Sequence, residues 1–211
     1  LDQIQVGRKL VVFKNAADAQ QLVPRLVGKM DVIGYNIEHG PSNRPEEQAD
    51  PVGSIRKMRE LADAYDLELA VGPDHDFALT AGPAMAPYAD IFVLQVQRVQ
   101  TEPDTVRQFV LPLVAQLREA NPDLAISIQV RTEGDVVAIA DLIASMEADL
   151  DGVSILTSPD TVDIAWELTA ALRPTVQIPS QGLGQAWIYL LLAAGLTGGA
   201  FFLYRRKTTT N

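Results

Sequence analysis

The stretch Asp31-Val-Ile-Gly-Tyr-Asn-Ile-Glu38 alternates between two kinds of side chain, and this alternation decides the fold class. Successive side chains of a β-strand point to opposite faces, so the bulky apolar residues share one face and the small or polar residues share the other. The apolar face carries Ile33, Tyr35 and Ile37, and the opposite face carries Gly34, Asn36 and Glu38. Strands of an open parallel sheet with helices on both faces are apolar throughout. The alternation therefore favours a barrel wall, with helices outside and a polar interior.

Four further segments along the chain alternate in the same way, and a short strand at Leu10–Phe13 precedes them all. The four segments are Leu67–Asp74, Asp90–Gln97, Ala125–Arg131 and Gly152–Thr157. Segments with helical spacing lie between and after the strands: Ala16–Val27, Val52–Tyr65, Pro103–Ala120, Gly134–Met146 and Thr161–Leu172. Alternating strands and helices predict an α/β fold of the (β/α) TIM-barrel type. Six or seven strands fall short of the eight of a closed barrel, which leaves two alternatives, an incomplete barrel or strands before Leu1.

Two connecting segments look irregular in the sequence. Asp74–Tyr88 is interrupted by Gly and Pro, and Pro45–Pro51 is interpreted as a solvated loop that leads into the helix at Val52.

Polar residues gather toward the carboxyl ends of the predicted strands, where barrels of this type hold their ligands. They are Asn36, Glu38, Asp74, Gln95, Gln97, Ser127, Gln129, Arg131 and Ser154. We expect Glu38 and Asp74 to be the catalytic candidates, as acid and base or as acid and nucleophile on a glycoside. The amides suit sugar hydroxyls, and Arg131 suits a carboxylate or uronate. The alternative is a purely structural network in which Glu38 and Arg131 pair across the interior.

Both histidines of the chain lie beside the same strand ends, as Glu38-His39 and Asp74-His75-Asp76. A metal site built from these five residues is the weaker interpretation, because adjacent residues of a strand point to opposite faces. Helix capping and loop structure are the favoured roles of the histidines, and we predict neither a metal nor a cofactor.

Ala186–Tyr204 is a run of 19 residues without a charge, and Arg205-Arg206-Lys207 follow it directly. As a helix it would span roughly 28 Å, about the thickness of the hydrocarbon core of a bilayer. The basic cluster after the run predicts a cytoplasmic C-terminus and an extracytoplasmic N-terminal domain. The predicted organisation is a barrel-like domain over 1–178, a linker over 179–185, a transmembrane helix over 186–204 and a basic tail over 205–211. Gly195 and Gly199 form a GxxxG spacing, at which a helix of another transmembrane subunit could pack.

The composition agrees with an extracytoplasmic location. The chain has no cysteine, which excludes disulfides, zinc–thiolate sites and thiol catalysis, and it begins at Leu1, as after removal of a signal peptide. It carries 27 Asp and Glu against 17 Lys and Arg, a net charge of −10, and every acidic residue precedes Pro174. A domain this acidic is a poor partner for nucleic acid.

The segments Tyr35-Asn-Ile-Glu-His-Gly40 and Glu46-Glu-Gln-Ala-Asp-Pro51 resemble those of an uncharacterised family of TIM-barrel, glycosidase-like proteins that bacteria export. The resemblance implies a barrel over roughly residues 8 to 178. The glycosidase placement of acid and nucleophile on the fourth and seventh strands is not evident in this chain.

These observations support two hypotheses for function. The first is an accessory or binding subunit of a larger membrane complex, with the bilayer, other transmembrane subunits and a carbohydrate or small polar ligand as partners. The alternative is a membrane-tethered, carbohydrate-active hydrolase that uses Glu38 and Asp74.

Overall fold

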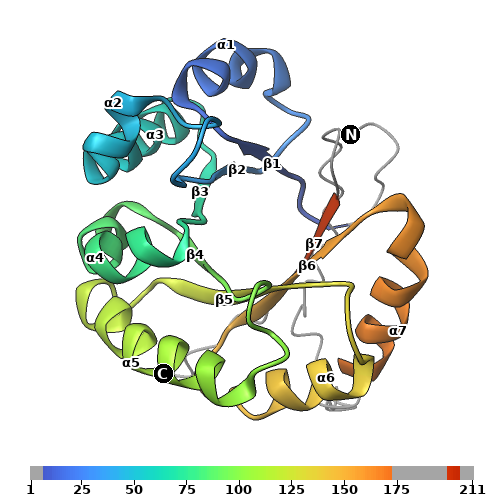
Figure 1. The fold of residues 1–211 in the computed structure, drawn as a ribbon. Helices are drawn as coiled ribbons and strands as arrows, with labels where there is room; N and C mark the ends of the chain where they lie inside the picture. Colours follow the sequence, from blue (N-terminus) through green and yellow to red (C-terminus); the bar gives the residue numbers. More distant parts are fainter. Residues whose placement is uncertain (1–6, 173–198, 205–211) are drawn as a thin grey trace, which may run out of the picture.

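The computed structural model describes residues 7–172 and 199–204, which form one curved sheet with helices around its outer face (Figure 1). Seven strands follow one another in chain order across the sheet: β1 (Leu10–Phe13), β2 (Val32–Tyr35), β3 (Glu68–Val71), β4 (Ile91–Gln95), β5 (Ala125–Arg131), β6 (Gly152–Thr157) and β7 (Gly199–Tyr204). The first six strands are parallel, and β7 runs antiparallel to β6. The predicted α/β fold is confirmed in the form of a partial TIM-barrel, a half-barrel of six parallel strands.

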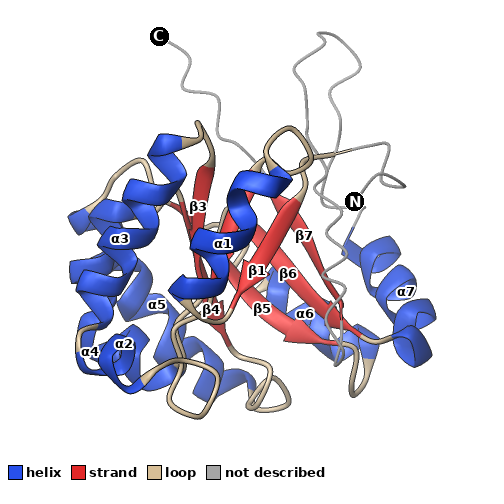
Figure 2. Cartoon of the chain, turned by 90° about the horizontal axis from the view of Figure 1, so that it is seen from above, coloured by secondary structure: helices blue, strands red, loops and turns tan. Residues whose placement is uncertain are grey.

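The helices lie between successive parallel strands and after the last of them, and they pack on the outside of the sheet (Figures 1 and 2). They are α1 (Ala16–Leu26), α2 (Pro45–Ala49), α3 (Pro51–Ala64), α4 (His75–Met85), α5 (Pro103–Ala120), α6 (Val136–Ala144) and α7 (Val162–Leu172), with short 3-10 turns at Ala86–Tyr88 and Pro159–Thr161. The main hydrophobic core lies between these helices and the sheet, and Ile33, Tyr35, Leu69, Phe92 and Ile128 are fully buried in it. The outer face of the strands is therefore the apolar face that the alternation predicts.

The inner face of the sheet carries a second, smaller apolar cluster. It is formed by Leu10, Val12, Val32, Ala70, Ile91, Val93 and Ala125. These residues lie toward the amino ends of the strands, and the polar residues of the same face follow them toward the carboxyl ends. The inner face of the sheet is therefore apolar toward the amino ends of the strands and polar toward their carboxyl ends.

Three aspartates repeat one hydrogen bond at the amino ends of the strands. Asp31, Asp90 and Asp151 stand immediately before β2, β4 and β6. Their Oδ2 atoms accept the backbone N–H groups of Lys9, Leu69 and Ile126, at or next to the starts of β1, β3 and β5, at 2.6, 2.7 and 2.9 Å. We call these three hydrogen bonds the aspartate clamps. Each clamp joins an odd-numbered strand to the even-numbered strand that follows it.

Two of the clamps are reinforced by an arginine from a helix. Arg59 of α3 pairs with Asp90 at 2.6 Å, and Arg118 of α5 pairs with Asp151 at 2.8 Å. The side chain of Asp151 is only 10% exposed, so its charge depends on these partners instead of on water.

Two segments interpreted as irregular are helical. Asp74–Tyr88 contains α4, because the Asp74 side chain caps the helix by accepting the Phe77 N–H at 2.9 Å, and the helix tolerates Pro83 in its interior. The predicted solvated loop at Pro45–Pro51 contains α2, in which the Glu47 side chain is buried.

The structure and the sequence prediction differ over the last six residues of the predicted transmembrane helix. Gly199–Tyr204 pairs along the whole of β6 as β7, so Gly199, a predicted helix-packing residue, lies opposite Thr157 in a sheet. A short apolar run is compatible with either a buried strand or a helix by periodicity alone, and the unpaired edge of β6 favours the strand. Within the described part of the chain, no helix combines the length and apolar character that crossing a bilayer requires. Gly195, the rest of the predicted span, the linker at 179–185 and the tail at 205–211 lie outside the described residues.

Candidate functional site

The polar residues of strands β4, β5 and β6 are brought together at the carboxyl end of the sheet's inner face. The register places Gln95, Gln129 and Ser154 side by side on three adjacent strands, and Ser127 lies one layer deeper, between Val93 and Gly152. We call these residues, together with Asn36, Glu38, Gln97 and Arg131, the inner polar layer.

A chain of hydrogen bonds runs through this layer from Glu38 to Gln97. The amide nitrogen of Gln95 donates to Glu38 Oε1 and to the carbonyl oxygen of Gly72, both at 3.0 Å. The amide nitrogen of Asn36 also donates to Glu38 Oε1, at 3.2 Å, and that of Gln97 donates to Gln95 Oε1 at 2.9 Å. Glu38 is therefore held by two amides and sits at one end of an ordered network.

Glycine at position 72 makes room for this network. A Cβ there would lie 2.7 Å from Asn36 Oδ1, closer than real Cβ contacts allow. Asn36 can therefore keep its place beside Glu38 only because residue 72 has no side chain.

Strand β5 supplies the other half of the layer. Gln129 donates to Ser154 Oγ at 3.2 Å. The backbone of Arg131 is held by the buried side chain of Gln100, which donates to its carbonyl oxygen at 3.0 Å and accepts its N–H at 2.8 Å. The guanidinium of Arg131 contacts only Glu133 in the described residues, at 3.4 Å. The predicted pairing of Glu38 with Arg131 is not formed, since each residue has other partners.

Three buried polar atoms of the inner polar layer have no hydrogen-bond partner among the described residues: Gln97 Oε1, Ser127 Oγ and Arg131 Nε. Buried polar atoms in folded proteins are almost always paired with protein or with water. Two more such atoms in the described residues, the Tyr35 hydroxyl oxygen and Arg59 Nε, lie elsewhere, so this layer holds three of the five.

Asp74 lies next to this layer but its carboxylate is already engaged. Besides capping α4, it accepts the backbone N–H of His39 at 2.6 Å and contacts His39 Nδ1 at 2.7 Å, both through Oδ2. Partial burial acts to raise the pKa of Asp74, but the hydrogen bonds from the His39 and Phe77 N–H groups and from the His39 ring outweigh it and lower the pKa. Asp74 is therefore held as an ionised acceptor, which suits it to orienting His39 better than to donating a proton.

The two histidines have separate surroundings. The His39 ring stacks on Phe77 with 4.0 Å between ring centroids, whereas His75 packs on Phe109 of α5 and contacts Asp76 at 3.2 Å. In the described residues, no group of three or more His, Asp or Glu side chains is arranged to hold a metal ion.

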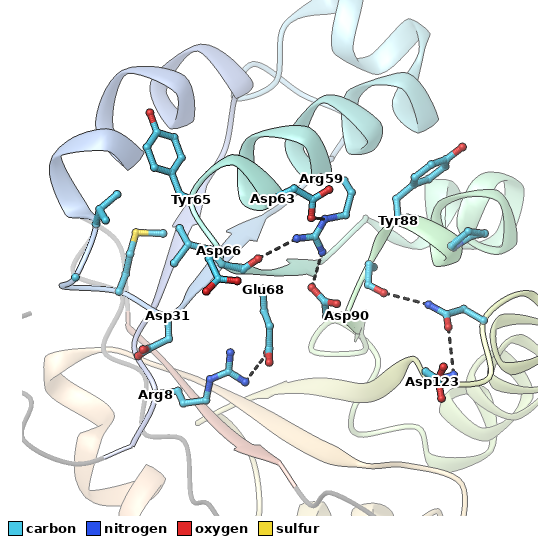
Figure 3. Close-up of a pocket in the computed structure, with 17 residues that line it drawn as sticks. Arg8, Asp31, Arg59, Asp63, Tyr65, Asp66, Glu68, Tyr88, Asp90 and Asp123 are labelled. Atoms are coloured by element: carbon cyan, nitrogen blue, oxygen red, sulfur yellow. Dashed lines mark hydrogen bonds and ion pairs between the residues drawn. The ribbon is translucent and has the colours of Figure 1, made fainter.

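The opposite end of the sheet contains a cleft of about 840 Å³ (Figure 3). Its two arginines pair with carboxylates: Arg8 with Glu68, and Arg59 with Asp63 and Asp90. Figure 3 shows Arg59 between Asp63 and Asp90. Arg59 also donates to the Leu67 carbonyl oxygen at 2.9 Å. The charged groups that form these pairs already serve the fold.

The sequence analysis identified neither the aspartates and arginines that pair at the amino ends of the strands nor Gln100, which holds the backbone of Arg131. A signal was present, because an aspartate precedes each even-numbered parallel strand, as Asp31-Val32, Asp90-Ile91 and Asp151-Gly152.

No protein-family model matches the chain, and no curated protein matches it in sequence. Among solved structures, citrate synthase SbnG matches at 14% identity over 80% of this chain and 74% of that chain, with a TM-score of 0.55. An HpcH/HpaI aldolase from Desulfitobacterium hafniense matches at 15% identity over 80% and 73%, with a TM-score of 0.49. A truncated 3-deoxy-D-arabino-heptulosonate 7-phosphate synthase from Thermotoga maritima matches at 14% identity over 69% of this chain, with a TM-score of 0.41. This chain spans about half of the length of that synthase, 51%.

These likenesses show the fold alone. The likeness to citrate synthase SbnG supports the barrel-like part of the predicted resemblance. The exported and glycosidase-like parts of that resemblance stay predictions.

Proposed function

We propose that this chain is a binding protein, whose inner polar layer holds a carbohydrate or small organic anion at the carboxyl ends of the strands. The observation that carries the proposal is the set of three buried, partnerless atoms at Gln97, Ser127 and Arg131. An unpaired buried polar atom lowers the stability of a fold by about 1 to 3 kcal/mol. Several such atoms in one place therefore indicate that another interaction offsets this loss. A bound polar ligand would pair them once the side chains that cover them move aside, because each of these atoms exposes less than 1 Å².

The layer also has the chemistry of a binding site. Glu38, the Gln side chains and Ser154 offer donors and acceptors, and Arg131 offers a positive charge in an otherwise acidic protein. In barrels of this type, ligands bind at the carboxyl ends of the strands, and the opposite end contributes stability. The paired charges of the amino-terminal cleft fit that division.

A screen of carbohydrates and small organic anions by thermal shift, with ligand-observed NMR on the hits, tests the proposal. We expect a hit whose binding is lost in Gln129→Leu and kept in Gln21→Leu, an exposed glutamine on α1 that serves as the matched control. A screen without hits, or a hit that binds Gln129→Leu as well as the wild type, would contradict the proposal.

The predicted membrane location is part of the same proposal. A helix over 186–204 would hold the domain outside the cell membrane as an accessory subunit, with Gly195 and Gly199 packed against a neighbouring subunit. The support is the uncharged run and the basic cluster after it. Because Gly199–Tyr204 cannot be β7 and part of a membrane helix at the same time, the two arrangements can be separated experimentally.

Engineered cysteines distinguish them cleanly, since the chain has none of its own. Leu156 and Ala200 are partners in the β6–β7 pair, so Leu156→Cys with Ala200→Cys should cross-link wherever β7 is formed. We expect no cross-link in the membrane fraction of cells that express the full chain. Quantitative cross-linking there, or release of the chain by alkaline carbonate, would refute the anchor.

Acid–base catalysis is a second candidate, and the contact between His39 and Asp74 favours it. A carboxylate that accepts from Nδ1 leaves Nε2 of the ring as the proton acceptor, and stacking on Phe77 fixes the plane of the ring. In this candidate function Asp74 orients His39, which acts as the base, and Glu38 supplies the catalytic carboxyl group of the predicted hydrolase. In a glycan hydrolysis screen, Glu38→Gln and His39→Gln should each lower turnover by about 100-fold or more. His75→Gln is the matched control, and turnover that survives Glu38→Gln would reject this candidate.

A further inference from the structure

The orientation of two amides defines what a ligand must offer to the inner polar layer. The amide nitrogen of Gln95 faces Glu38 Oε1 and the Gly72 carbonyl oxygen, and a carbonyl oxygen can only accept. The nitrogen of Gln95 must therefore stay on that side, and its oxygen faces Gln97.

The orientation of Gln97 follows from that of Gln95. Since Gln95 Oε1 accepts a hydrogen bond, the Gln97 group that reaches it at 2.9 Å must be the amide nitrogen. Gln97 Oε1 is then turned away from Gln95, and it is buried without a partner among the described residues. The network that starts at Glu38 thus presents a hydrogen-bond acceptor at Gln97, and a ligand must meet it with a donor.

Arg131 presents the opposite requirement. Its Nε–H is a buried donor without a partner, and its NH1 group is 3.4 and 3.5 Å from the Glu133 carboxylate oxygens, longer than usual for such a pair. The Glu133 side chain is 68% exposed, so a carboxylate from a ligand can replace it at little cost. Gln97 lies two residues beyond Gln95, as Arg131 lies two residues beyond its strand partner Gln129. The acceptor and the donor therefore both follow the level of Gln95 and Gln129 in the chain, Gln97 in the turn after β4 and Arg131 at the end of β5.

Ser127 extends the site inward. Its hydroxyl group lies two levels below Arg131 on the same face of β5, and it can either donate or accept. Gln129 and Gln95 lie on the level between them. A ligand that satisfies all three atoms must be elongated, with polar groups along its length.

We infer that the ligand is a hydroxylated monocarboxylate of the sugar-acid type, with its carboxylate on Arg131, one hydroxyl group donating to Gln97 Oε1 and a further hydroxyl group reaching Ser127. A plain carboxylate has no donor for Gln97, and a neutral polyol has no charge for Arg131. A single carboxylate matches the single cationic group of the inner polar layer, Arg131, whose Nε has no partner among the described residues. This inference rests on the proposed binding function and specifies its ligand class.

Calorimetric titration with three probes of similar length tests the ligand class: gluconate, glucitol and hexanoate. They share a six-carbon chain, and glucitol lacks the carboxylate while hexanoate lacks the hydroxyl groups. We expect gluconate to bind at least about tenfold more tightly than either of the others, because each of these leaves one buried group unpaired.

Variants assign the two ends of the ligand. Arg131→Met should weaken gluconate binding by about 30-fold, and Gln97→Met by about fivefold, as expected for a charge-assisted and a neutral hydrogen bond. Arg25→Met and Gln21→Met replace exposed residues of α1 and are the matched controls. Arg131→Lys keeps the charge but loses Nε–H, and it should recover only part of the affinity. Thermal melting of each variant confirms that it is folded.

Equal binding of glucitol or hexanoate, absence of gluconate binding, or full gluconate binding by Arg131→Met would each overturn the ligand class. A hit from the wider screen that is lost in Gln129→Leu would leave the binding function standing in all three cases, so the two failures are distinguishable.

Discussion

At the amino ends of the strands, three aspartates accept backbone N–H groups and two arginines pair with two of these aspartates. At the carboxyl ends of the same strands, glutamine and serine side chains form an ordered network that leaves buried atoms at Gln97, Ser127 and Arg131 unpaired. Paired charges thus complete the fold at one end, while an amide oxygen, a hydroxyl group and one guanidinium N–H group are left without partners among the described residues at the other. The difference teaches that paired groups mark the scaffold of this half-barrel, and that unpaired buried groups mark its proposed site.

The largest effect is expected at the amino-terminal end. Asp151→Ala removes the clamp on Ile126 and leaves the Arg118 charge without its carboxylate, so the free energy of unfolding should fall by about 3 kcal/mol. Urea denaturation measures the change. Asp141→Ala, an exposed position on α6, is the control and should stay within about 0.5 kcal/mol of the wild type. If Asp151→Ala lowers the free energy of unfolding no more than Asp141→Ala does, the clamps do not stabilise the fold and the contrast between the two ends of the strands fails.

A smaller effect is expected at Asp74, on the boundary of the site. Asp74→Ala should cost about 1 kcal/mol at pH 7, as the loss of a helix cap does. Because the pKa of Asp74 is lowered in the folded protein, its charge adds stability above its ordinary value of 3.8, and that contribution disappears as the pH falls through the folded-state pKa. Urea denaturation of wild type and variant at several pH values should show the two converging at acidic pH. A difference that grows on acidification would mean that the pKa is raised instead.

The smallest effect, and one of opposite sign, is expected inside the site. Ser127→Ala removes a buried hydroxyl group that has no partner in the described residues, so it should leave the stability unchanged or raise it by about 0.5 kcal/mol. The same substitution should weaken binding of the ligand. If Ser127→Ala instead destabilises the empty protein by more than about 1 kcal/mol, its hydroxyl group serves the fold, and the contrast between the two ends is reduced.

The sequence predicted the face of each strand because side-chain direction in a strand has a period of two. Once Ile33 and Tyr35 are placed outward, Asn36 and Glu38 must point inward, and the same reasoning placed Gln95, Gln129 and Ser154 together. The parallel register then brought these residues onto adjacent strands.

The sequence could not predict which partner each side chain would choose. In the structural alternative Arg131 pairs with Glu38, but in the structure it contacts Glu133, two residues away, and Glu38 Oε1 accepts from Gln95 and Asn36. The sequence analysis did not predict that Asp74 caps α4, because Gly82 and Pro83 made that segment look irregular. Such choices depend on distances between segments far apart in the chain, and local periodicity carries no information about these distances. The predicted catalytic role of Asp74 stays a prediction.

The predicted helix and the structure differ at Gly199–Tyr204 for another reason. Six apolar residues such as Gly199–Tyr204 satisfy the requirements of a strand and of a helix, and only the neighbouring edge of β6 distinguishes them.

The aspartate clamps also show how this protein could be recombined. Arg59 and Asp90 both lie in the segment from α3 to β4, and Arg118 and Asp151 both lie in the segment from α5 to β6, so each reinforced clamp is contained in a block of two helices and two strands. The joint between these two blocks falls in the loop between β4 and α5, which contains Gln97 and Gln100. Exchanging one block for its counterpart from another half-barrel would therefore leave the reinforced clamp of the other block intact while it changed the residues that face the ligand. The aspartate clamps at the amino ends of the strands thus divide the chain into modules. Exchange of a module can change which ligand is bound while the scaffold stays the same.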